Sequence, residues 1–253
     1  MSESESIVIA PKDPASIVKL QDPSVIEQLL ENPPAVLAEL LAGWFSSGNG
    51  FLPAAGCRIA QAAFKAQAFK QFGREFKYLR EKGKIPEDFT EKKYGNKSWV
   101  ELLTVIDEDM PDEDRLEALK AMFYSVNKIN ATDGERIANY QLFQIAKKLS
   151  SGQLLYLKVS YGFFKTSDFM RGQITGTSQW LNKVGNKLGH NVIGLLEQDD
   201  TALIGHGLLA ERYHPDRSGI METDAHMTPL GIKFCQNIEE YCIESADERP
   251  SPK

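Results

Sequence analysis

The sequence has little cysteine, no long apolar run and none of the common catalytic motifs. Its three cysteines include no CxxC pair, which fits a reducing cytosol better than a disulfide framework. No stretch of about eighteen apolar residues lacks charge, so we expect no ordinary transmembrane helix. P-loop, GxSxG and GxGxxG motifs are absent, and we therefore predict no catalytic residue and no bound cofactor.

Positive charge is also in deficit. The chain has 29 Lys and Arg against 35 Asp and Glu, a net charge of −6. This balance argues against broad, non-specific binding to nucleic acid. Residues 1–5 are polar and acidic, the reverse of a signal peptide, so we expect a cytoplasmic protein.

What the sequence does contain is helical periodicity, clearest in three consecutive segments in the middle of the chain. The first predicted helix begins at Pro111. Three carboxylates follow Pro111 in the first turn, where they offset the positive end of the helix dipole. Capping boxes predict the starts of the second and third helices. In these boxes Thr132 pairs with Glu135, and Ser150 pairs with Gln153.

The sequence also predicts one more helix start and which side chains and helices are buried. Ser98 and Glu101 form a third capping box, which would open a helix over 99–106. Ile137 falls on the apolar face of its helix, so we expect it to be buried. The helix that follows Ser150 is apolar on nearly all sides, and we expect it to be the central one.

The longest predicted helix covers about 52–82 and ends at Gly83. It has seven Lys and Arg against two Glu, on a chain that is acidic as a whole. Such a helix could face phosphate, lipid headgroups or an acidic partner, or its cations could simply solvate an outer face. The candidate interaction residues on it are Arg58, Lys65, Lys70, Arg74, Lys77 and Arg80.

The last part of the chain predicts two helices, a hairpin over 208–227 and a closing helix that Thr228 caps. This order is typical of a winged-helix domain, in which the second helix often reads DNA. Here that helix, over 191–206, has no Lys or Arg, and 166–253 has eight cations against thirteen carboxylates. We therefore favour protein contact over DNA reading for this part.

These patterns predict a mainly α protein with a helical bundle and a winged-helix-like α+β part. We place flexible tails at both ends, the bundle between them and the winged-helix-like part after it. The predicted boundaries are 1–20 for the first tail, 21–165 for the bundle, 166–243 for the winged-helix-like domain and 244–253 for the last tail.

Two parts of the chain contain residue types that bind metals, but neither has the spacing of a metal site. The acidic segment 107–114 lacks the Gly and the bidentate Glu that an EF-hand loop needs at fixed positions, so we interpret it as a helix start. All four histidines lie in the last third of the chain with two cysteines, but without the paired spacing of a zinc site. They are His190, His206, His214 and His226, with Cys235 and Cys242.

Residues 35–57 contain a single charge, Glu39, over two short helical segments. A membrane-inserting hairpin is one interpretation of this stretch. Each arm is too short to span a bilayer alone, and close packing of Ala and Gly inside a bundle explains the stretch equally well.

The second half of the chain resembles the Abi-alpha-like family of bacterial abortive-infection proteins over about 115–243. The resemblance lies in Leu149-Ser150-Ser151-Gly152-Gln153-Leu154-Leu155-Tyr156-Leu157, in the segment Leu203 to Arg212, and in Met227-Thr228-Pro229-Leu230-Gly231-Ile232-Lys233-Phe234. It implies a bacterial cytosolic protein that acts in phage defence, with no established catalytic residues to transfer.

The sequence therefore predicts a non-catalytic interaction or assembly protein, with a protein partner or a second copy of the chain. Two alternatives stay open. One is a regulator that binds nucleic acid through 52–82, and the other is a membrane-acting effector that uses 35–57.

Overall fold

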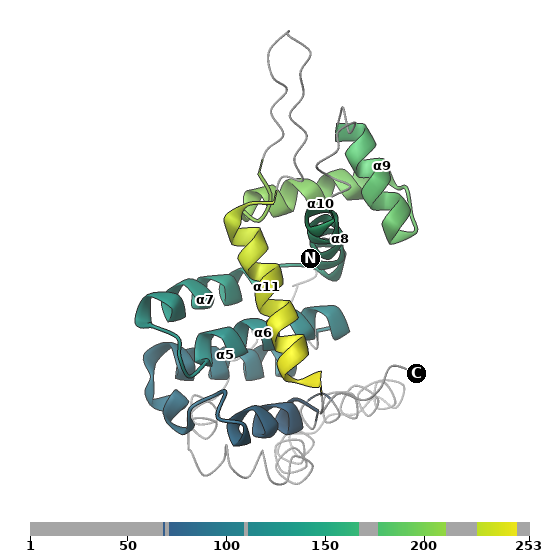
Figure 1. Cartoon of the computed structure of the whole chain (residues 1–253). Coiled ribbons are helices and arrows are strands. Elements are labelled where there is room, and N and C mark those ends of the chain that lie inside the picture. The colour runs from purple at the N-terminus through teal and green to yellow at the C-terminus, as the bar shows by residue number, and fades with distance from the viewer. Residues whose placement is uncertain (1–67, 69–70, 109–110, 167–176, 211–226, 247–253) are drawn as a thin grey trace, which may run out of the picture. The chain divides into compact units, whose positions relative to one another are not determined.

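The computed structural model describes residues 68, 71–108, 111–166, 177–210 and 227–246. Over these ranges the chain is mainly helical, as predicted, and no strand is present among them (Figure 1). The chain divides into two compact units. The first ends at Lys77 and the second begins at Tyr78.

The described elements of the second unit are one short 3-10 helix and a series of α-helices. They are η1 (Glu87–Glu91), α5 (Lys93–Glu108), α6 (Glu113–Asn127), α7 (Asp133–Ala146), α8 (Ser151–Lys165), α9 (Thr177–Leu188), α10 (Ile193–Gly205) and α11 (Pro229–Glu244).

Of the long helix predicted over 52–82, the structure describes residue 68 and the turns from residue 71 onward. Phe72 and Phe76 are buried, and their ring centroids lie 5.9 Å apart, so this part of the predicted apolar seam is confirmed. The helix ends at Gly83, whose φ of 67° only glycine adopts readily. The N–H of Lys84 then donates to the carbonyl of Leu79 at 2.8 Å, as in a Schellman-type cap.

The central helix of the second unit is α6, which packs against α5, α7, α8 and α11. Every residue from Ala118 to Asn127 is buried. The prediction that α8 is central is wrong, because Leu155 and Phe164 on that helix are 40% and 45% exposed. Apolar composition on all sides does not bury a helix unless neighbouring helices also cover every side.

The predicted capping boxes of α7 and α8 are confirmed, with both reciprocal bonds present at each start. The predicted start of α6 is displaced, because Asp112 rather than Pro111 lies at the boundary. The Asp112 side chain accepts a hydrogen bond from the N–H of Arg115 at 3.0 Å, which makes Asp112 the N-cap.

Two predictions about burial and capping in α5 and α7 are wrong. Helix α5 begins at Lys93 and runs through Ser98, whose hydroxyl donates within the helix to the carbonyl of Gly95 at 2.9 Å. Ser98 is therefore a buried helical residue and no N-cap. On α7 the side chain of Ile137 is exposed, whereas Tyr140 and Phe143 face the core.

The end of the unit follows the predicted order only in part. Thr228 caps α11, as predicted, by accepting a hydrogen bond from the N–H of Gly231 at 3.0 Å. Where a hairpin was predicted, the described residues show one isolated antiparallel bridge, between Leu209 and Met227. The rest of the predicted hairpin, residues 211–226, lies outside the described ranges.

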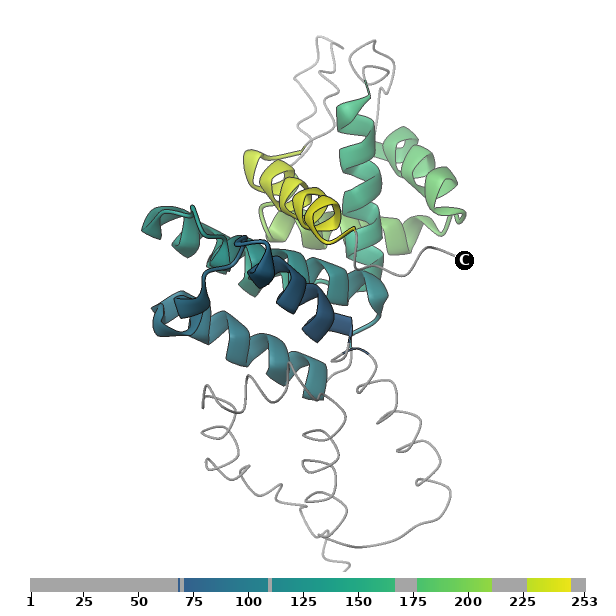
Figure 2. The ribbon, with the colours of Figure 1, turned by 60° about the horizontal axis from the view of Figure 1, so that its bottom comes forward.

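The helices of the second unit pack across the position where we predicted a domain boundary, near residue 166. Helix α8 contacts α9 and α10, and α11 returns to pack on α6 and α8. Figure 2 shows α9 and α10 beside α8, against which α11 also packs.

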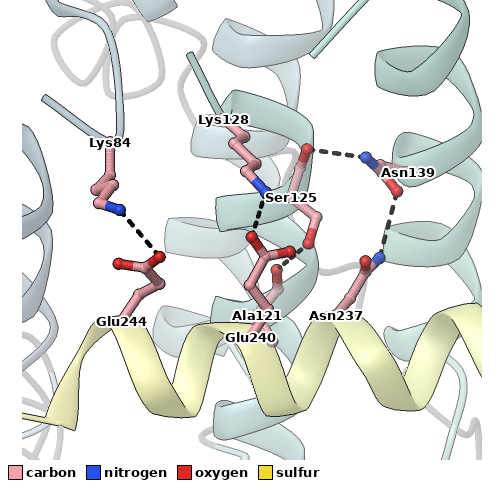
Figure 3. A network of polar contacts seen from close by, with 8 residues as sticks. All are labelled: Lys84, Ala121, Ser125, Lys128, Asn139, Asn237, Glu240 and Glu244. Atoms are coloured by element: carbon pink, nitrogen blue, oxygen red, sulfur yellow. Dashed lines mark hydrogen bonds and ion pairs between the residues drawn. The ribbon is translucent and has the colours of Figure 1, made fainter. Parts of the chain in front are cut away.

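Helix α11 is joined to the middle of the unit by a chain of amides (Figure 3). The side-chain amide of Asn237 donates to the side-chain oxygen of Asn139 on α7 at 3.2 Å. Asn139 in turn donates to the backbone carbonyl of Ser125 on α6 at 2.9 Å. Both asparagines are buried, so each bond satisfies a polar group that water does not reach.

Two glutamates nearer the end of α11 form ion pairs at its surface. Glu244 pairs with Lys84 at 3.0 Å, and Glu240 pairs with Lys128 (Figure 3). All four side chains retain between 28% and 41% exposure, and pairs of this kind contribute about 0 to 1 kcal/mol each.

Candidate functional site

The structure describes half of the six candidate interaction residues on the basic helix. Arg74 and Lys77 are exposed and Arg80 is half-buried. On the opposite side of the helix Glu75 is fully buried and accepts a hydrogen bond from Gln71 at 3.0 Å. The described turns therefore separate an outer cationic face from a buried inner face. The remaining candidates, Arg58, Lys65 and Lys70, lie outside the described residues.

Glu101 is a partly buried acceptor that joins α5 to α7. Its carboxylate accepts hydrogen bonds from Tyr140 at 2.6 Å, Gln144 at 2.5 Å and Lys147 at 2.8 Å. Burial raises the pKa of Glu101, but the bonds from Lys147, Tyr140 and Gln144 outweigh it and hold the pKa below its ordinary value. One cation and two neutral donors therefore stabilise the charged carboxylate, which functions as a structural tie between the helices.

Two tyrosines and two lysines meet beside this tie, and we name them the lysine–tyrosine surface: Lys93, Tyr94, Lys97 and Tyr140. The rings of Tyr94 and Tyr140 lie 5.2 Å apart between centroids, with planes inclined at 44°. The ammonium of Lys97 lies 5.1 Å from the Tyr140 centroid, and that of Lys93 lies 5.6 Å from the Tyr94 centroid. Our sequence analysis missed this cluster. The run of three lysines around Tyr94 is the signal that could have indicated it.

A buried hydrogen-bonded set joins the three helices α8, α9 and α10. Tyr156 donates to the carboxylate of Asp200 at 2.7 Å, and the indole N–H of Trp180 donates to the Tyr156 oxygen at 2.9 Å. One carboxylate, one phenol and one indole are thus used to fix the positions of three helices.

Cys235 lies in a cluster of ionisable groups between α8 and α11. Glu239 accepts hydrogen bonds from Tyr161, at 3.1 Å, and from Lys165. Burial, followed by the charge of Glu239, raises the pKa of the Cys235 thiol to about 12. At neutral pH this thiol is protonated, and the thiolate is the form that attacks electrophiles and binds metals.

The outer face of α10 presents two apolar side chains. Val192, at the N-cap, and Leu195, in the first turn, are 54% and 53% exposed. Leu196, the next residue along, is fully buried and holds the helix to the unit. We name Val192 and Leu195 the α10 apolar pair.

The metal and membrane interpretations gain no support from the described part of the chain. No group of three His, Cys, Asp or Glu there could hold a metal ion, while His214 and His226 lie outside it. Among the helices that the structure describes, none is long and apolar enough to cross a bilayer. Residues 35–57, which suggested a membrane hairpin, are not among those described.

Comparison with protein-family models found no match, and searches of curated proteins and of solved structures found none either.

Proposed function

We propose that this chain is a non-catalytic interaction protein and that α10 carries its contact surface for a protein partner. The observation that carries the proposal is the α10 apolar pair. Single exposed apolar residues are common on protein surfaces and need no explanation. Val192 and Leu195, however, are spaced three apart at the start of one helix, a spacing that places neighbouring side chains on one face, and both are more than half exposed.

The charge of α10 favours a protein partner over DNA. This helix contains Glu197, Asp199 and Asp200 and no Lys or Arg. Neutralisation of phosphates by cations provides most of the non-specific affinity of proteins for DNA, and α10 offers none. Glu197 is exposed and Asp199 is half-exposed, whereas Asp200 is buried against Tyr156. An apolar pair with these two carboxylates on the same helix suits a partner surface that is itself apolar with a basic rim.

A winged-helix-like arrangement is part of this proposal. The order α9, α10, antiparallel bridge and α11 supports it, because the bridge between Leu209 and Met227 lies where the wing would begin and end. In such an arrangement α10 would take the place of the recognition helix, with its exposed side turned to a protein.

We further propose that the partner belongs to a bacterial anti-phage system, which the resemblance to the Abi-alpha-like family suggests. The test is the efficiency of phage plating on cells that carry the gene with its native neighbours, compared with cells that lack only this gene. We expect a large drop in plating that requires the gene. Equal plating across a broad panel of phages would contradict the role in defence.

The contact surface itself is tested with V192E/L195E against Q198E/T201E, which adds the same charge at exposed positions of the same helix. We expect phages to plate on cells with the first variant as efficiently as on cells without the gene. The same variant should no longer capture the proteins encoded by the neighbouring genes, or, if the partner is a second copy, should no longer self-associate in sedimentation. The second variant should behave like the wild type. Equal behaviour of the two variants, at unchanged helical content, would rule out α10 as the contact.

A further inference from the structure

The lysine–tyrosine surface carries positive charge that the protein does not neutralise. Lys93 and Lys97 are exposed, and neither has a carboxylate partner within the described residues. The neighbouring carboxylates are otherwise engaged, since Glu101 binds Lys147 and Asp88 pairs with Lys92 at 3.3 Å. The ammonium groups of Lys93 and Lys97 instead lie over the rings of Tyr94 and Tyr140, which carry no charge to neutralise them.

The same surface offers an aromatic ring. Tyr94 is half-buried, whereas Tyr140 is almost fully buried behind it and is fixed by its bond to Glu101. Tyr140 therefore packs against the Tyr94 ring, and the flexible side chain of Lys93 lies over that ring, so a base could stack there once the Lys93 ammonium moves to a phosphate. A ring held in this way can stack with a flat ligand without first losing much conformational freedom.

We propose that the lysine–tyrosine surface binds single-stranded nucleic acid, with phosphates on Lys93 and Lys97 and a base stacked on Tyr94. Cations beside an accessible aromatic ring are the combination with which proteins hold single strands. A duplex keeps its base faces inside its own stack, so it would meet the lysines but not the ring. An acidic peptide would satisfy the charge and leave Tyr94 unused. The inference is independent of the α10 contact.

Fluorescence anisotropy of the full chain with a labelled single strand tests the proposal. The probe is an oligonucleotide of mixed sequence, about 12 nucleotides long, prepared as DNA and as RNA, with a DNA duplex of the same sequence for comparison. We expect both single strands to bind at about 50 mM salt, more tightly than the duplex, and to weaken steeply by about 200 mM.

Charge variants then locate the binding. K93Q/K97Q should weaken binding at low salt and reduce the slope of log K against log salt by about 1.4, because two phosphate contacts are lost. K187Q/K233Q removes two exposed lysines from α9 and α11 and should bind like the wild type. R74Q/K77Q tests the basic helix and should retain most of the binding.

Ring variants separate stacking from charge. We expect Y94A to lose about 5- to 150-fold in affinity for single strands, and Y94F to keep it. K93E provides a check on folding, because a carboxylate in the first turn of α5 favours the helix while it repels phosphate. It should therefore lose binding without loss of stability.

Several results would overturn the proposal. They are the absence of binding at about 50 mM salt, equal weakening by K187Q/K233Q, loss of binding in R74Q/K77Q but not in K93Q/K97Q, and indifference to Y94A. A duplex that binds as tightly as a single strand would also refute it, since the ring would then have no part.

Discussion

Gly95 lies where the first turn of α5 meets the backbone of η1, and no other residue fits there. A Cβ at this position would lie 2.0 Å from the carbonyl oxygen of Phe89 and 2.7 Å from the side-chain oxygen of Asn127. The close approach lets Trp99 and Phe123 each pack in a T-shaped arrangement with the Phe89 ring, with centroids 5.8 and 6.1 Å from it. One missing methyl group thus determines how α5, η1 and α6 meet.

We expect G95A to lower the free energy of unfolding by about 2 kcal/mol or more, because the η1 backbone must move to admit the methyl group. The matched control is G134A on α7, where a Cβ would meet nothing within 4 Å. That variant should be neutral or stabilising by up to about 1 kcal/mol. Urea denaturation measures both, and equal stabilities of the two variants would contradict the tight contact at Gly95.

Glu101 shows how one side chain can make stability depend on pH. Its pKa is lowered in the folded state, so its contribution is fully present above the unfolded pKa and is lost as pH falls through the folded pKa. We expect the wild type to lose stability below about pH 4.5. In E101Q this part of the loss of stability at low pH should be missing.

At neutral pH, E101Q should be less stable than the wild type by about 1.5 to 3 kcal/mol, because its bonds no longer involve a charged acceptor. Chemical denaturation at a series of pH values measures both effects. Parallel pH profiles of E101Q and the wild type would show that another group controls the acid loss.

Helix α11 is the element that closes the second unit, and two kinds of polar contact add to its buried apolar face. Its amide chain through Asn237 is buried, whereas its ion pairs through Glu240 and Glu244 are partly exposed to water. Solvent screening weakens exposed pairs, and the loss of a buried bond leaves its partner without water to replace it. The buried amides should therefore matter more than the charges, although the charges are more numerous.

The comparison of N237A with E240Q tests this order. We expect N237A to cost about 1 to 3 kcal/mol, because Asn139 keeps a buried oxygen without its donor. E240Q should cost about 1 kcal/mol or less and should lose its effect in high salt. A larger loss in E240Q would show that charge rather than the amide chain holds α11.

Charge is unevenly distributed along the whole molecule. Residues 52–97 have eleven Lys and Arg against five Asp and Glu, whereas the chain as a whole has a net charge of −6. The basic segment belongs to both compact units, since it includes Arg74 and Lys77 before the division and Lys93 and Lys97 after it. A partner that recognises cations and one that recognises the acidic α10 would thus bind different parts of the chain.

This distribution gives a test that separates the proposed function from its nucleic-acid alternative on the basic helix. If protection against phage depends on α10, R74Q/K77Q should protect as well as the wild type in plating assays. If the basic helix binds phosphate as the essential step, the same variant should lose protection. Wild-type protection by K187Q/K233Q would show that loss of charge alone is not the cause.

Fractionation of cells during phage infection tests the membrane alternative. This alternative requires the chain to move to the membrane pellet when it acts, through residues 35–57. Protein that stays in the supernatant throughout a protective response would eliminate that alternative.

The sequence by itself determined the helical class and several of the helix ends. Thr132, Ser150 and Thr228 each cap a helix through an N–H three residues away, and Gly83 ends one through its positive φ. Such signals act within a few residues, so their physical cause is complete in the local sequence. The exposure of Arg74 and Lys77, in the predicted interaction set, follows from the helical spacing of the apolar residues, which places these two cations on the outer face.

Only the tertiary structure decided what lies inside and which side chains meet. Ser98 carries the local signal of a cap, but it is buried within α5, while Glu101 binds Tyr140, 39 positions away. The lysine–tyrosine surface likewise exists only because α7 brings Tyr140 to Tyr94. Burial and contact depend on which helices cover one another, and that packing is a property of the whole unit rather than of any local stretch.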